Sequence, residues 1–121
     1  MTGKVLVVED DDSLRDVVCT VLEMEGYVVF GAGTGQAALD QVEKNTPEVI
    51  LLDVSFPQMD GAAFFAELER LKLEARPKVI VLTADTRGRQ IADDIGASGY
   101  MEKPFSIPAL LQQIEQILAQ A

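Results

Sequence analysis

The chain has 121 residues, of which 48% are hydrophobic and 25% are charged, a composition typical of one globular domain and not of a disordered tail or a fibre. The 10 Lys and Arg residues stand against 20 Asp and Glu residues, so the net charge at pH 7 is −10. Because no basic stretch offers a footprint for a phosphate backbone, we do not expect the domain to bind nucleic acid directly.

Cysteine content and hydropathy exclude further classes of protein. The single cysteine, Cys19, has no histidine or second cysteine to pair with, so disulfide, zinc and Cys–His catalytic sites are excluded. No apolar run approaches the roughly 18 residues of a membrane span, and the first one is too short for a signal peptide. We therefore expect a cytoplasmic protein without a membrane partner.

Short apolar segments alternate with longer segments of helical period along the chain, which is typical of βαβ units that wind a parallel sheet. In chain order, the expected strands cover residues 4–8, 27–30, 49–52, 78–82 and 100–101. The expected helices follow them at residues 13–25, 34–46, 61–71, 87–95 and from 106 onward.

Capping residues and apolar spacing support these bounds. Thr34 and Ser106 can accept hydrogen bonds at the start of their helices, and Gly26 and Gly96 can end helices as C-caps. Apolar residues recur every three or four positions, as do Leu14, Val17, Val18, Val21 and Leu22 in the first expected helix.

The strands are almost continuously apolar, which indicates a sheet covered by helices on both faces. Crossovers between parallel strands are right-handed almost without exception. The predicted fold class is therefore α/β. It is a single-domain, doubly wound, five-stranded parallel sheet of the (βα)5, flavodoxin-like type, with strand order 2-1-3-4-5, over residues 1–121.

Acidic residues follow two of the strands. Asp53 ends the apolar run 49–52, and Glu9 and Asp10 follow the first strand. In the predicted strand order the first and third strands are neighbours, so these side chains meet at the carboxyl edge of the sheet, where open α/β sheets bind ligands. Close carboxylates repel one another unless a cation lies between them, and oxygen ligands without His or Cys favour Mg²⁺.

Two further side chains at this edge favour phosphoryl chemistry. Thr83 offers a hydroxyl group at the end of the fourth strand, and Lys103 offers an ammonium group beyond the fifth. Phosphoryl transfer depends mostly on positioning and on neutralising charge, which a metal, a lysine and hydrogen-bond donors supply. Asp53 is then the predicted nucleophile, and its product is an aspartyl phosphate.

Several short motifs occur together in one order along the chain: Val7-Val8-Glu9-Asp10, Leu52-Asp53 with Pro57, Met59-Asp60-Gly61, Leu82-Thr83-Ala84, Gly96-Ala97 with Tyr100, and Lys103-Pro104-Phe105. In this combination the chain resembles the receiver domain of bacterial response regulators across essentially its whole length. The resemblance implies a signalling domain of a two-component system. It also implies that the chain is not a conventional enzyme and catalyses only its own phosphorylation and dephosphorylation.

The resemblance implies how the acidic residues act. Asp53 resembles the phosphoacceptor. Glu9 and Asp10 resemble the acidic pair that holds Mg²⁺ with it, together with the backbone carbonyl of Ser55. Glu9 stands where Asp is equally usual, and its longer side chain favours a water-mediated contact with the metal. Ser55 and Asp85 are expected to flank the path of the attacking water and to tune hydrolysis.

The resemblance also implies a switch. Thr83 and Lys103 resemble the pair that contacts the phosphoryl group, and Tyr100 resembles the aromatic residue that turns inward behind it. In the family this changes the face made by the fourth helix, fifth strand and fifth helix, through which an effector or a second copy can bind. The bond between Lys103 and Pro104 is expected to be cis.

The implied phosphoryl donor is a phosphohistidine of a sensor histidine kinase or of a histidine phosphotransfer protein. Two other functions stay open. A phosphatase of the haloacid dehalogenase type also uses a nucleophilic Asp with Mg²⁺ on a similar sheet, but it needs a second Asp where this chain has Ser55. A receiver-like domain that has lost its chemistry would act only through protein interactions.

Overall fold

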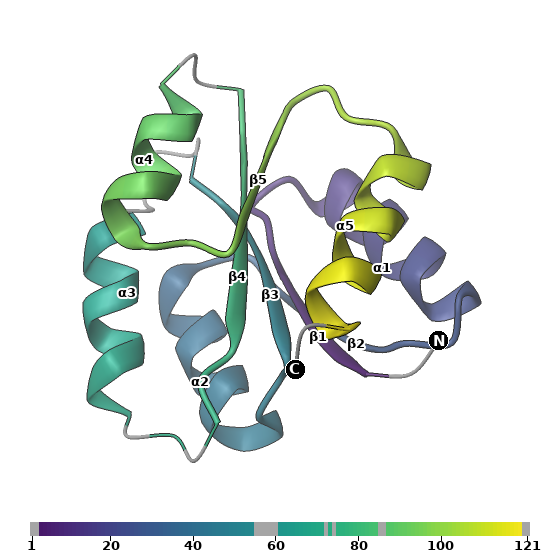
Figure 1. Cartoon of the computed structure of the whole chain (residues 1–121). Coiled ribbons are helices and arrows are strands. Elements are labelled where there is room, and N and C mark those ends of the chain that lie inside the picture. The colour runs from purple at the N-terminus through teal and green to yellow at the C-terminus, as the bar shows by residue number, and fades with distance from the viewer. Residues whose placement is uncertain (1–2, 55–60, 72, 74, 85–86, 120–121) are drawn as a thin grey trace.

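The computed structural model of the chain describes residues 3–54, 61–71, 73, 75–84 and 87–119. Within them, strands and helices alternate (Figure 1). The strands are β1 (Lys4–Val8), β2 (Val28–Ala32), β3 (Val49–Asp53), β4 (Lys78–Thr83) and β5 (Gly99–Glu102). The helices are α1 (Asp12–Met24), α2 (Gly35–Asn45), α3 (Gly61–Arg70), α4 (Gly88–Ile95) and α5 (Ile107–Ala119). In this described part of the chain, no helix is both long enough and apolar enough to cross a membrane.

The strands form one parallel sheet in the order β2-β1-β3-β4-β5. This confirms the predicted fold class and strand order. In the register of the sheet, Val8 lies beside Leu52, and Asp53 lies beside Leu82. The carboxyl ends of β1, β3 and β4 therefore reach the same edge of the sheet.

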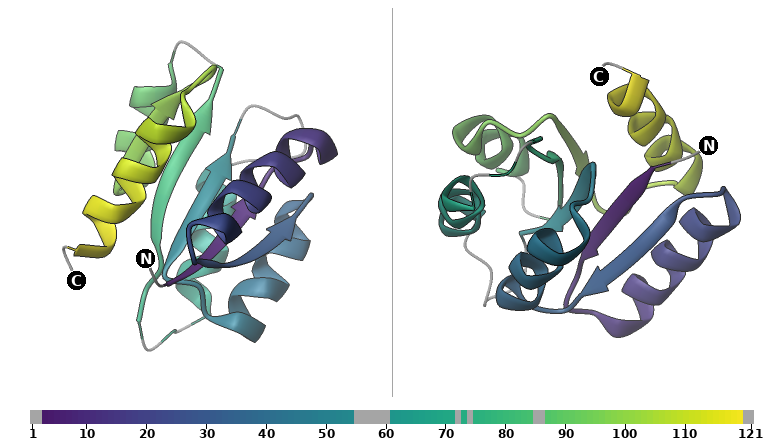
Figure 2. Two further views of the ribbon diagram at one scale, coloured as in Figure 1. Left: turned by 90° about the vertical axis from the view of Figure 1, so that its right-hand side faces the viewer. Right: turned by 90° about the horizontal axis from the view of Figure 1, so that it is seen from below.

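Helices cover both faces of the sheet (Figures 1 and 2). Side chains alternate between the two faces along each strand. Val5 and Leu51 pack in a buried cluster with residues of α1 and α5, whereas Leu6 and Leu52 pack in a second cluster with residues of α2, α3 and α4. Because both faces are buried, the central strands are apolar at consecutive positions.

The predicted capping residues are found at the helix ends. The Oγ1 of Thr34 and the Oγ of Ser106 each accept a hydrogen bond from the amide three residues further on, at 3.1 and 3.2 Å. Gly96 ends α4 with a φ of 71°, and Gly26, one residue beyond the C-cap of α1, has a φ of 98°. Each helix bound that was predicted lies within one residue of the observed bound, and these caps mark four of the helix ends.

Val17 belongs to the apolar repeat of the first helix but is not buried. Its side chain is 53% exposed, while Val18 and Leu22 on the same helix are buried. Consecutive residues lie about 100° apart around a helix, so the side of α1 that presents Val18 to the sheet turns Val17 away from it.

The strands are longer than their apolar runs. β3 includes Asp53, β5 covers Gly99–Glu102, and β2 starts one residue later than predicted and ends at Ala32. Ala32 pairs with Val8 of β1. A strand ends where its backbone stops pairing with its neighbour, and small or polar residues can pair as well as apolar ones.

Candidate functional site

Three carboxyl groups lie together at the carboxyl edge of the sheet. Asp53 is the last residue of β3 and is 1% exposed, Glu9 directly follows β1 and is 3% exposed, and Asp10 is exposed. The amide of Glu9 donates a hydrogen bond to the carbonyl of Ala32 at 3.0 Å, which extends the pairing of β1 and β2 by one step. One carboxylate oxygen from each acid lies within 4.8 Å of the other two. The structure thus brings together the acids predicted as metal ligands.

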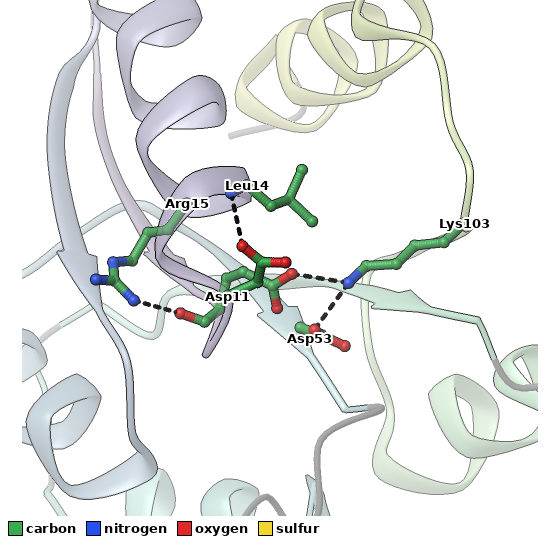
Figure 3. A network of polar contacts seen from close by, with 6 residues as sticks. Asp11, Leu14, Arg15, Asp53 and Lys103 are labelled. Atoms are coloured by element: carbon green, nitrogen blue, oxygen red, sulfur yellow. Dashed lines mark hydrogen bonds and ion pairs between the residues drawn. The ribbon is translucent and has the colours of Figure 1, made fainter.

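Lys103 lies between two of these acids (Figure 3). Its Nζ donates hydrogen bonds to Oε1 of Glu9 and to Oδ2 of Asp53, both at 2.8 Å. The backbone of Lys103 is fixed by a 2.8 Å hydrogen bond from its amide to the carbonyl of Thr83. The peptide bond to Pro104 is cis, as the resemblance implied. The Lys103 side chain is 20% exposed, so both ion pairs are largely shielded from water.

Burial and close charges shift the pKa values of these groups. Burial first, and then the neighbouring Asp53 carboxyl group, raise the pKa of Glu9 from 4.5 to about 7, although Lys103 opposes the change. Burial by itself lowers the pKa of Lys103, but its hydrogen bonds to Asp53 and Glu9 outweigh burial, so the pKa rises overall. Lys103 therefore keeps its charge near neutral pH, whereas Glu9 changes charge there.

The donor set fits a hard divalent cation. Each of the three acids offers carboxylate oxygens, and the chain has no His. Within the described residues, Oε2 of Glu9 is buried and has no hydrogen-bond partner. A buried polar oxygen without a partner is costly, and a cation held beside Asp10 and Asp53 would give it one. Mg²⁺ suits this set because it binds one or two carboxylates and completes its shell with water and phosphate oxygens.

Arg15 belongs to this site and was not predicted from the sequence (Figure 3). Its Nη1 donates to the backbone carbonyl of Glu9 at 2.7 Å. Its Nη2 donates to Oδ1 of Asp12 at 2.6 Å. The guanidinium lies so close to Gly33 that a methyl group there would be 3.0 Å from Nη1. Arg15 therefore fixes the backbone from which the Glu9 side chain projects. The only sequence signal is an arginine in the first helix opposite two glycines, Gly31 and Gly33.

Thr83 and Tyr100 lie on the next two strands. Thr83 ends β4, is fully buried, and pairs in register with Glu102. Tyr100 is half-buried in β5 beside Val81, and its carbonyl accepts a hydrogen bond from Nε2 of Gln113 at 3.1 Å. The predicted phosphoryl-contacting hydroxyl is thus one strand away from the end of β3, and the predicted switch aromatic is one strand further.

Some predicted site residues lie outside the described residues. These are Ser55 and Asp85, which were predicted to tune hydrolysis, with the Ser55 carbonyl also predicted as a metal ligand. The motif residues Pro57, Met59 and Asp60 lie outside them as well. Their roles stay predictions.

Curated proteins similar to this chain are regulators of transcription. It is 33% identical over 120 residues to the phosphate regulon transcriptional regulatory protein PhoB of Escherichia coli, covering 98% of this chain and 52% of PhoB. It is 34% identical over 117 residues to the probable transcriptional regulator ycf27 of Guillardia theta, covering 95% of this chain and 45% of that protein. The chain thus spans about half the length of these relatives.

Two of the similar solved structures match this chain over nearly the whole length of both proteins. A putative response regulator from Chloroflexus aurantiacus has a TM-score of 0.87 and 30% identity, covering 98% of this chain and 99% of that one. The chemotaxis protein CheY4 of Vibrio cholerae has a TM-score of 0.84 and 32% identity, covering 97% and 99%. The family model for the response regulator receiver domain matches residues 5–115. The chain therefore belongs to the family of response regulator receiver domains, which are signalling domains of two-component systems.

Proposed function

We propose that the chain, over residues 1–121, is a phosphoacceptor domain in which Asp53 takes a phosphoryl group from a phosphohistidine of a sensor histidine kinase or a histidine phosphotransfer protein. The observation that carries this proposal is the ion-paired acidic cluster. The buried Asp53 carboxylate lies 2.8 Å from the ammonium group of Lys103 and within 4.8 Å of oxygens of Glu9 and Asp10. A nucleophile, a fixed cation and a metal-binding pair are thus available at one point of the sheet edge.

Asp53 acts as the nucleophile in this proposal. A carboxylate oxygen forms the new P–O bond while the P–N bond of the phosphohistidine breaks, and the bonding electron pair returns to the imidazole nitrogen. Lys103 neutralises charge on the transferring oxygens. Glu9, Asp10, Asp53 and the carbonyl of Ser55 would hold Mg²⁺, which would supply further positive charge at this site.

Thr83 and Tyr100 then couple phosphorylation of Asp53 to a conformational change at the surface. The Thr83 hydroxyl is drawn toward the phosphoryl oxygens and the Tyr100 ring turns further inward, so the arrangement that contacts the phosphoryl group gains population. The affected face is formed by α4, β5 and α5. A hollow of about 430 Å³ lies on this face, and Tyr100 and Gln113 are among the residues that line it. We place the contact with a downstream effector or a second copy of the chain on this face.

Hydrolysis of the aspartyl phosphate is expected to be slow and tuned by two side chains. Ser55 and Asp85 flank the path of the attacking water in this proposal and act on its orientation. Exchanging both residues should change the dephosphorylation half-life, and an unchanged half-life would remove this role.

Intact-mass spectrometry tests the phosphoacceptor. After incubation with acetyl phosphate and Mg²⁺, the protein should gain the mass of one phosphoryl group, and EDTA should prevent the gain. Asp53→Asn should gain nothing, while Asp16→Asn, a control at an exposed position of α1, should behave like the wild type. No gain in the wild type, or an equal gain in Asp53→Asn, would identify a phosphate-independent interaction domain instead. Steady turnover of a small phosphomonoester would favour a phosphatase.

A further inference from the structure

Gly88, the first residue of α4, lies closer to β4 and β5 than any residue with a side chain could. A methyl group built on its α-carbon would be 2.1 Å from Cγ2 of Thr83 and 2.8 Å from Cε2 of Tyr100. Carbon atoms in contact are normally at least about 3.5 Å apart. The Thr83 methyl group and the Tyr100 ring therefore occupy the space that a side chain at position 88 would need.

The group of Thr83 that faces Gly88 is the methyl group, not the hydroxyl. Both are attached to the same β-carbon, so rotation about the Cα–Cβ bond moves them together between staggered positions. Thr83 is fully buried, which leaves its methyl group no empty space to enter without moving a neighbour. A hydroxyl group that turns toward a new partner must therefore take the methyl group away from Gly88.

We propose that the contact of the Thr83 methyl group with the α-carbon of Gly88 is the mechanical link by which the phosphoryl site moves α4. This inference rests on the proposed function, because it is the phosphoryl group that would turn the Thr83 hydroxyl. When the methyl group leaves Gly88, the first turn of α4 loses its packing partner on β4 and can settle into a new position. Gly88 is a positioning residue and does not touch the phosphoryl group.

Tyr100 extends this link to α5. Its ring shares the contact with Gly88, and its backbone carbonyl accepts the 3.1 Å hydrogen bond from Gln113 of α5. Arg89, next to Gly88, lines the hollow between α4 and α5 together with Tyr100 and Gln113. A shift in the first turn of α4 therefore changes the shape of that hollow.

A double-mutant cycle tests the contact in the unphosphorylated protein. Gly→Ala inside a helix normally stabilises it, but Gly88→Ala should lower the urea midpoint because the new methyl group displaces Thr83. Thr83→Ser removes Cγ2, the atom that would lie 2.1 Å from the new methyl group. Gly88→Ala should therefore lower the urea midpoint less in the Thr83→Ser background than in the wild type. Gln90→Ala, at an exposed position of the same helix, is the control and should be additive with Thr83→Ser. Additive effects of Gly88→Ala and Thr83→Ser would overturn the inference.

A second pair of variants gives a result even where Gly88→Ala fails to fold. Thr83→Val keeps a methyl group against Gly88 and loses the hydroxyl, whereas Thr83→Ser does the reverse. Amide hydrogen exchange in the first turn of α4 should be faster in Thr83→Ser than in Thr83→Val. Equal protection in the two variants, or weaker protection in Thr83→Val, would show that the methyl group does not hold the helix.

The link itself is tested by NMR with Mg²⁺ and beryllofluoride as the probe. In the wild type, the amide signals of α4 and the methyl signal of Thr83 should shift together on adding the probe. In Gly88→Ala, both signals should already be displaced before the probe is added, and the further change should be about half the wild-type change or less. Full wild-type shifts in Gly88→Ala would overturn the link. A wild-type protein that gains no phosphoryl mass from acetyl phosphate would instead overturn the proposed function and leave the packing result intact.

Discussion

Replacing Glu9 with glutamine should make the stability of the protein less dependent on pH. Burial first, and then the Asp53 carboxyl group, raise the pKa of Glu9 in the folded protein from 4.5 to about 7. Between these pH values the unfolded chain carries an ionised Glu9, while the folded protein keeps the group protonated. The stability that Glu9 contributes is therefore complete below pH 4.5 and is lost as the pH rises to about 7.

The change in pKa sets the size of this effect. A rise from 4.5 to about 7 corresponds to about 3 kcal/mol in the free energy of unfolding. Glutamine copies the neutral carboxyl group in shape, and its oxygen can still accept a hydrogen bond from Lys103. Without metal, Glu9→Gln should be more stable than the wild type at pH 8 by up to about 3 kcal/mol, with the difference shrinking toward acid pH. Mg²⁺ should oppose this difference at pH 8, because it stabilises only the ionised Glu9.

Urea unfolding between about pH 5 and pH 8, in EDTA, measures this difference directly. Glu43→Gln, at an exposed position of α2, is the matched control and should follow the wild type at every pH. Other acids titrate in both proteins, so only the difference between variant and wild type carries information. A gap between Glu9→Gln and the wild type that stays constant over this pH range would refute the reasoning.

The remaining predictions concern the metal site and the core. Lys103→Met should slow phosphorylation by acetyl phosphate about a hundredfold. The same variant should bind Mg²⁺ more tightly, because the ammonium group no longer competes for the carboxylates. Weaker Mg²⁺ binding in an NMR titration would contradict this. In the same titration Asp10→Asn should weaken Mg²⁺ binding about tenfold, or about 1.4 kcal/mol, and an unchanged affinity would remove Asp10 from the ligand set. Leu52→Ala should lower the free energy of unfolding, measured in urea, by about 2–5 kcal/mol. Val17→Ala should lower it by less than about 0.5 kcal/mol. Equal decreases in the two variants would contradict the assignment of Leu52 to the core.

The sequence predicted the fold well because local and long-range signals agree. The run Val5-Leu6-Val7-Val8 is apolar at every position since both faces of β1 are covered by helices. Thr34 and Ser106 mark helix starts through hydrogen bonds that their own side chains make three residues away. The acid cluster followed from the strand order, because the carboxyl ends of neighbouring parallel strands share an edge.

Features that depend on distances between elements could not be predicted. The contact of Arg15 with the Glu9 carbonyl exists because α1 lies against the glycines at the end of β2. The raised pKa of Glu9 comes chiefly from burial, which side-chain type does not reveal. The exposure of Val17 could not be predicted because apolar spacing alone does not say which side of a helix meets the sheet. The approach of Gly88 to Thr83 likewise becomes visible only when α4 is placed over the sheet.

The position of Lys103 has a consequence for how the domain would be loaded. With its ammonium group 2.8 Å from both Glu9 and Asp53, the chain carries its own counter-ion. Because this ammonium group already neutralises part of the negative charge, we expect the chain to fold without a bound metal. On the proposed function, such a domain would become phosphorylated only when a phosphoryl donor and free magnesium are present at the same time.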